Sequence, residues 1–142
     1  MAYVSVITGG TGGMGIEIAK RLAKNTKILL CGRRESKLAE AKAALKDCEN
    51  VEYAVMDVVN RDDIKAAVEK AREMGEVKNV IHAAGVNEFT NGKPNDPGFI
   101  LENNIKGAQY IAEAFLPIIC EGGSYLNIAS MSSYYNPLPD YI

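Results

Sequence analysis

Short apolar runs alternate along the chain with longer segments whose apolar residues recur at helical spacing. A short apolar run is typical of a strand buried on both faces, and helical spacing is typical of a helix that buries one face. The pattern predicts strands at residues 4–7, 27–31, 51–55, 79–82 and 125–128, and helices at residues 14–24, 35–47, 61–74 and about 98–120.

Turn-forming residues separate these segments. Gly75 is expected to stop the third helix, and residues 87–97, with two prolines and an Asn-Gly pair, are expected to form a surface loop. At the fourth helix we expect Asp96 to cap the start and Pro117 to kink or tighten the last turn. Gly122 and Gly123 would end that helix, and residues 130–142 are expected to be irregular.

The regular alternation of strands and helices predicts one α/β domain over residues 1–142. Right-handed crossovers between parallel strands give a Rossmann-type doubly wound sheet between two helical layers. Numbered along the chain, the strands are expected in the order 3-2-1-4-5. Ligands bind such sheets at the carboxyl ends of the strands, so the residues that follow each strand are the candidates for function.

Composition and charge exclude several classes of protein. The net charge of −2 gives no basic surface for nucleic acid, and the apolar runs are too short to span a membrane. No signal-peptide pattern precedes the first strand. Three scattered cysteines and a single histidine indicate reduced thiols in a cytoplasmic protein, with no metal cluster and no Ser-His-Asp triad.

Five glycines fall within residues 8–15, directly after the first strand and before the first helix. A glycine-rich turn in this setting presents backbone N–H groups and a helix N-terminus to an anion. We therefore expect a dinucleotide pyrophosphate here; the alternative is a turn that only requires positive φ. The expected cofactor-binding residues of the turn are Gly9, Thr11, Gly12, Gly13, Met14 and Gly15.

Two arginines, Arg33 and Arg34, follow the second strand, where an NAD-binding domain usually has an acid for the adenine ribose. A guanidinium group matches a 2′-phosphate, and a cation at the start of a helix is unfavourable without an anion nearby. The sequence therefore favours NADP(H) as cofactor, with NAD(H) as the alternative.

The other strand ends offer further candidates. Asp57 can accept from the adenine amino group, with Val58 against the ring, or it only caps a turn. The small residues Ala83, Ala84 and Gly85 would let a cofactor ribose pass close to the backbone, and His82 before them is expected to be a hydrogen-bonded structural residue. Ser130, after the fifth strand, either binds a substrate oxygen or satisfies loop backbone.

Together these segments resemble the short-chain dehydrogenase/reductase superfamily. The matching motifs are residues 8–15 with T-G-x-x-x-G-x-G, Asp57 with the Asp after the third strand, Ala84–Gly85 with the end of N-N-A-G, residues 104–107 with N-x-x-G, and residues 127–130 with the strand that ends at the catalytic Ser. His82 and Ala83 depart from the pattern, because they replace both asparagines of N-N-A-G.

The resemblance implies hydride transfer between a nicotinamide and a carbonyl or alcohol carbon. By the same resemblance, Ser130 binds the substrate oxygen and Asn104 holds a water of the proton relay. The family's Y-x-x-x-K is missing, because Tyr134, Tyr135 and Tyr141 have no Lys four residues later. We therefore expect the N-terminal part of an alcohol dehydrogenase or carbonyl reductase, inactive alone and without the usual C-terminal strands, helices and substrate lobe.

Two alternatives remain open at this point. The first is a nucleotide-sugar epimerase or dehydratase, because the glycines also fit the T-G-x-x-G-x-x-G of those enzymes. The second is a dinucleotide-binding module that has no catalytic activity. Family members commonly form dimers and tetramers through the fourth helix and a later one, so the resemblance implies a homodimer or homotetramer. The apolar positions of the fourth helix include Phe99, Ile105, Tyr110, Ile111 and Phe115.

Overall fold

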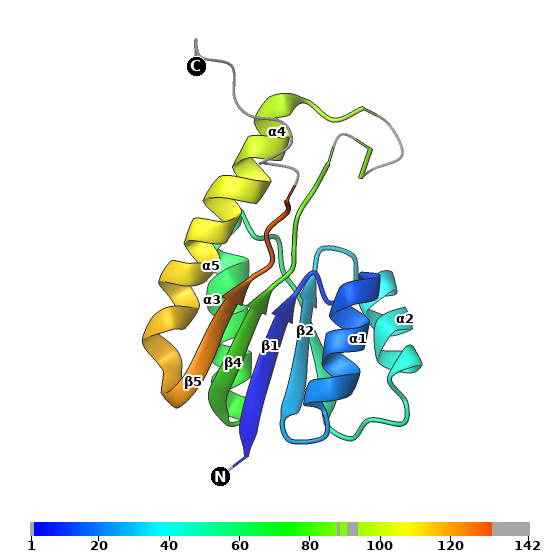
Figure 1. Ribbon diagram of the computed structural model, residues 1–142, viewed down its shortest axis with the longest axis vertical. Helices are drawn as coiled ribbons and strands as arrows, with labels where there is room; N and C mark the ends of the chain where they lie inside the picture. The colour runs from blue at the N-terminus through cyan, green and yellow to red at the C-terminus, as the bar shows by residue number, and fades with distance from the viewer. Residues whose placement is uncertain (1, 88, 91–93, 132–142) are drawn as a thin grey trace.

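A computed structural model describes residues 2–87, 89–90 and 94–131. Its centre is a sheet of five parallel strands in the order β3-β2-β1-β4-β5, which confirms the predicted order (Figure 1). The strands are β1 (Tyr3–Thr8), β2 (Lys27–Gly32), β3 (Val51–Val55), β4 (Glu76–His82) and β5 (Ile119–Asn127).

Helices cover both faces of the sheet. Figure 1 shows α1 and α2 on one face, and α3 and α5 on the other. The helices are α1 (Gly13–Leu22), α2 (Glu35–Ala44), α3 (Arg61–Met74), α4 (Pro97–Leu101) and α5 (Gly107–Phe115), with a π-helical turn at Glu102–Lys106 and a 3₁₀ turn at Leu116–Ile118. None of the helices in the described residues is long and apolar enough to cross a membrane.

The apolar run of β2 is explained by burial on both faces. Ile28 and Leu30 pack in the core under α1 and α2, whereas Leu29 and Cys31 pack in the core under α3 and α5. Successive side chains of a strand point to opposite faces, so a strand between two helical layers needs apolar residues at every position. All four of these side chains are fully buried.

The prediction of one continuous fourth helix over about residues 98–120 is wrong, because the helix is interrupted and ends earlier. The chain passes from α4 through the π-helical turn into α5, and the 3₁₀ turn that contains Pro117 ends the helical region at Ile118. Cys120 already lies in β5. A π turn is defined by backbone hydrogen bonds between residues five apart, and the spacing of apolar residues in the sequence does not show which residues make such bonds.

Gly122 and Gly123 lie inside β5 rather than at a helix end, which corrects a second expectation. The pairing with β4 shifts from Val77–Ile119 to Asn79–Ser124, so β5 bulges at this point. Gly122 has a φ of +69°, and a Cβ on Gly123 would lie 2.5 Å from the carbonyl oxygen of Lys78. The glycines are therefore explained by a bulged strand.

Candidate functional site

The turn between β1 and α1 uses its glycines in two different ways. Gly9 has a φ of +67°, and a Cβ there would lie 2.7 Å from the backbone nitrogen of Ala84. A Cβ on Gly15 would lie 2.6 Å from the carbonyl oxygen of Gly9. By contrast, a Cβ on Gly13 would meet nothing within 4 Å, and one on Gly12 would meet only Gly9, at 3.5 Å. Packing therefore accounts for Gly9 and Gly15 but leaves Gly12 and Gly13 without a reason inside the described chain.

The start of α1 has no stabilising side chain of its own. Its N-cap residue is Gly12, which makes no side-chain capping hydrogen bond, and its first turn holds no acidic residue. The first backbone N–H groups of a helix have no partner within the helix and carry the positive end of its dipole. This end of α1 is suited to an anion.

A cavity of about 220 Å³ lies at the carboxyl ends of β1 to β4. Nine of the predicted cofactor residues line it: Gly9, Thr11, Gly12, Arg33, Arg34, Val58, Ala83, Ala84 and Gly85. Gly13, Met14, Gly15 and Asp57 neighbour these residues in the chain but are not among those that line the cavity. Parallel strands that end at one edge explain why segments far apart in sequence meet here.

Seven residues that line the cavity were not predicted from the sequence: Thr8, Cys31, Gly32, Met56, Val86, Thr90 and Asn103. Four of them lie directly before predicted site residues, at the end of a strand or just after it: Thr8, Cys31, Gly32 and Met56. Counting the last residues of each strand as candidates would have included them. Asn103 comes from the π-helical turn and follows no strand, so no strand-end rule points to it.

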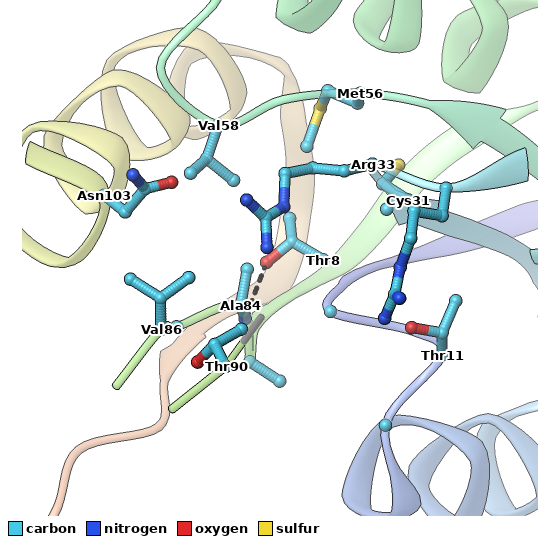
Figure 2. Close-up of a pocket in the computed structure, with 16 residues that line it drawn as sticks. Thr8, Thr11, Cys31, Arg33, Met56, Val58, Ala84, Val86, Thr90 and Asn103 are labelled. Atoms are coloured by element: carbon cyan, nitrogen blue, oxygen red, sulfur yellow. Dashed lines mark hydrogen bonds between the residues drawn. The ribbon is translucent and has the colours of Figure 1, made fainter. Parts of the chain in front are cut away.

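The two arginines enter this cavity without a carboxylate partner in the described part of the chain. Arg33 extends across the cavity toward Thr8 and Ala84 in Figure 2, and its guanidinium carbon lies 5.9 Å from the centre of the Phe99 ring. Arg34 is the N-cap residue of α2 and makes no side-chain capping bond. A cation at the start of a helix is unfavourable for the helix dipole, and an anion bound between the two arginines would offset this cost, in addition to the acidic Glu35 of the first turn.

Asp57 and Val58 have different surroundings. The Oδ1 of Asp57 accepts a hydrogen bond from the backbone N–H of Val59 at 3.1 Å, which is the turn contact weighed above as one of its two roles. Its own N–H donates to Oδ2 of Asp63 at 3.0 Å. Val58 is buried and points into the cavity (Figure 2).

His82 has the structural role expected of it. Its Nδ1 lies 2.7 Å from Oγ1 of Thr8, and that oxygen also accepts from the N–H of Ala84 at 3.3 Å. The Thr8 hydroxyl proton is therefore free to be donated to Nδ1, which fits a neutral imidazole. Burial lowers the pKa of His82 and favours the same neutral form. The pair holds the end of β4 against the end of β1.

Asn104 ties the helical region to the segment after β4. Its Oδ1 accepts from the N–H of Val86 at 2.9 Å, and its Nδ2 donates to the carbonyl oxygen of Val86 at 2.8 Å. Ser130 follows β5, whose pairing with β4 continues through the hydrogen bond from Ile128 N–H to the His82 carbonyl at 3.0 Å. Neither Asn104 nor Ser130 lines the cavity, and the tyrosines at 134, 135 and 141 lie outside the described residues.

The chain is similar to one protein family and to several oxidoreductases. The family model described as short chain dehydrogenase matches residues 3–140. An uncharacterized oxidoreductase of Staphylococcus saprophyticus is 34% identical over 140 residues, and one of Staphylococcus aureus is 31% identical over 138 residues. Each alignment covers 92% of this chain, and the chain spans 60% and 59% of those relatives.

Solved structures resemble the fold along almost the whole chain. A short-chain dehydrogenase/reductase from Burkholderia phymatum in complex with NAD superposes with a TM-score of 0.84 at 27% identity, covering 96% of this chain and 52% of its own. A variant of actinorhodin polyketide ketoreductase with NADPH gives a TM-score of 0.80 at 25% identity, covering 96% and 56%. Structural neighbours thus include both an NAD and an NADPH complex.

Proposed function

The chain belongs to the short-chain dehydrogenase family, and from that premise we propose that it supplies the nucleotide-binding segment of an NADP(H)-dependent alcohol dehydrogenase or carbonyl reductase. The observation that carries the choice of NADP(H) is the pair Arg33 and Arg34, which line the cavity and form no ion pair within the described ranges. The activity is proposed for the whole oxidoreductase, because the chain spans about 60% of its relatives' length.

The residues present fit a dinucleotide. Gly12 and Gly13 have room that packing does not use, beside the uncapped start of α1, and this room suits a pyrophosphate. Arg33 and Arg34 would hold the 2′-phosphate, Val58 would face the adenine ring, and the small residues 83–85 would let the nicotinamide ribose pass. When bound, the cofactor supplies the hydride carrier.

We assign Ser130 to the substrate oxygen and Asn104 to the proton relay of the whole enzyme. Both ends of the Asn104 amide bond the backbone of Val86, and these contacts hold the residue next to the segment that follows β4. The sequence holds no Tyr that is followed four residues later by Lys, so the family's proton donor has no counterpart in it. We therefore expect the 142-residue chain to bind nucleotide and to have negligible turnover.

Turnover is measured by following NADPH absorbance with a panel of ketones and aldehydes. We expect the rate to stay at the level of a protein-free blank while nucleotide fluorescence still reports binding. Steady NADPH oxidation by the purified chain would contradict the proposed division between cofactor binding and catalysis.

The cofactor choice is tested by titrating Arg33→Ala with NADPH and NADH. One lost charge-assisted hydrogen bond to phosphate lowers affinity about ten- to hundredfold, and NADH has no 2′-phosphate to lose it from. The ratio of NADPH to NADH affinity should fall by that factor. Arg72→Ala, which removes an exposed charge from the last turn of α3, is the matched control and should leave the ratio unchanged. An unchanged ratio in Arg33→Ala would contradict NADP(H) preference.

We also propose a single cytoplasmic domain that self-associates as a homodimer or homotetramer. Three free cysteines support a reducing compartment.

Three apolar side chains support self-association, because they are more than half exposed along α4, the π-helical turn and the 3₁₀ turn: Leu101, Ile105 and Leu116. Ile111 and Phe115 are fully buried in the core and do not contribute to that surface. Sedimentation of Ile105→Lys against the wild-type chain tests it: a lower mass for the variant is expected.

A further inference from the structure

Asn103 is a buried polar side chain in the cavity that no motif assigns. It is only 4% exposed. Its Nδ2 donates to the carbonyl oxygen of Phe99 at 3.0 Å, and only the nitrogen end of the amide can serve that carbonyl. The oxygen end is therefore directed the other way, and Figure 2 shows it pointing into the cavity toward Val58.

The backbone holds Asn103 at this wall by two local features. It lies in the π-helical turn Glu102–Lys106, a rare geometry that changes the direction of side chains relative to a regular helix and recurs at functional sites. Gly107 follows that turn, and a Cβ on it would lie 2.6 Å from Cγ2 of Val58. The close approach that this glycine allows brings Asn103 next to the cavity wall formed by Val58.

Asn103 lies on the side of the cavity where the nucleobase would lie if Arg33 bound the 2′-phosphate of the same nucleoside. In the sheet order β3-β2-β1-β4-β5, β2 and β3 lie on the opposite side of β1 from β5 and Ser130. Met56 and Val58, which follow β3, form the apolar wall beside Arg33. Asp57 between them accepts the N–H of Val59 on Oδ1 and does not line the cavity, whereas Asn103 lines the cavity and directs its amide oxygen into it.

We propose that Oδ1 of Asn103 accepts a hydrogen bond from the exocyclic amino group of adenine and thereby selects adenine over a 6-oxopurine. This inference rests on the proposed NADP(H) binding. A 6-oxopurine would place a carbonyl oxygen opposite Oδ1, and two acceptors cannot form a hydrogen bond. The Nδ2 contact with Phe99 keeps the amide from rotating to offer its donor instead.

The test compares NADPH with its hypoxanthine analogue, in which the 6-amino group is replaced by oxygen, by fluorescence titration. We expect the wild-type chain to bind NADPH about three- to tenfold more tightly than the analogue. Asn103→Leu keeps the side-chain volume and removes the acceptor, so its affinity ratio should fall to about one. Thermal unfolding of each variant checks that it is folded.

A second truncation keeps the test usable if Asn103→Leu does not fold. The hydroxyl of Asn103→Ser can still donate to the Phe99 carbonyl but is too short to reach the base, so its ratio should also fall to about one. NADH and its hypoxanthine analogue, measured in parallel, should give the same pattern without the 2′-phosphate.

The possible failures are distinguishable. A wild-type chain that binds both dinucleotides, with a ratio that Asn103→Leu or Asn103→Ser leaves unchanged, would overturn the role of Asn103 and leave the proposed function intact. A wild-type chain that binds none of the four dinucleotides would overturn the proposed function and this inference together.

Discussion

The helices α1 and α3 begin at the same edge of the sheet, and their first turns are completed in opposite ways. The N-cap of α3 is Asn60, whose Oδ1 accepts from the N–H groups of Asp62 and Asp63 at 3.0 and 3.1 Å. Both of these acids also complement the helix dipole. The N-cap of α1 is Gly12, which has no side chain to accept a hydrogen bond, and no acid follows it.

The α3 start has a side-chain acceptor for its first-turn N–H groups within the chain, whereas the α1 start has none. The α3 start is stabilised by groups of its own chain and lies outside the lining of the cavity. The α1 start is left with its positive end unmatched, and Gly12 lines the cavity. Three substitutions test this contrast, in order of the expected change in the free energy of unfolding.

Gly9→Ala should have the largest effect, because it attacks the turn that positions the start of α1. The alanine would have to adopt a φ of +67° with its Cβ 2.7 Å from the backbone of Ala84. Strain and steric overlap together should lower the free energy of unfolding by about 2–4 kcal/mol. Chemical denaturation measures this value. A variant as stable as wild type would show that the turn is not held against the Ala83–Ala84 backbone.

Asn60→Ala should have an intermediate effect and should act on stability alone. It leaves two N–H groups of α3 without their acceptor, which costs about 1 kcal/mol. Because Asn60 does not line the cavity, dinucleotide affinity measured by fluorescence titration should not change. A large loss of affinity at equal degree of folding would mean that the two helix starts are not functionally separate.

The sequence predicts most of the fold because burial on both faces leaves a strong pattern. Residues 28–31 are apolar at every position, and each face of that strand enters a different core, so both the strand and its place inside a parallel sheet follow from the residues. The fourth helix could not be predicted in the same way. A π turn at Glu102–Lys106 and a bulge at Gly122 depend on packing against Val58 and pairing with β4, which are contacts between distant segments.

The residues of the cavity were likewise only partly predictable from the sequence. Residues such as Arg33 and Ala84 were predicted to be near one another because the carboxyl ends of parallel strands meet at one edge. Asn103 was not predicted, since its orientation is set by a hydrogen bond to Phe99 and by the close approach of Gly107 to Val58. Neighbouring asparagines at 103 and 104 look alike in sequence, yet one faces the cavity and the other binds the backbone of Val86.

Gly12→Asn should change stability least of the three substitutions. It tests the contrast between the two helix starts most directly, because it gives α1 the same N-cap residue that α3 has. Gly12 has φ −78° and ψ 163°, an extended conformation that any residue can adopt, and its Cβ would be at an ordinary 3.5 Å from the Gly9 carbonyl. The asparagine oxygen should accept from the first-turn N–H groups and raise the free energy of unfolding by only about 0.3 kcal/mol. The same N–H groups would then be less available to phosphate, so NADPH affinity should fall about three- to tenfold. Gly12→Ala is the control, because it adds the Cβ without the acceptor; equal NADPH affinity in the two variants would mean that the uncapped start of α1 contributes nothing to phosphate binding.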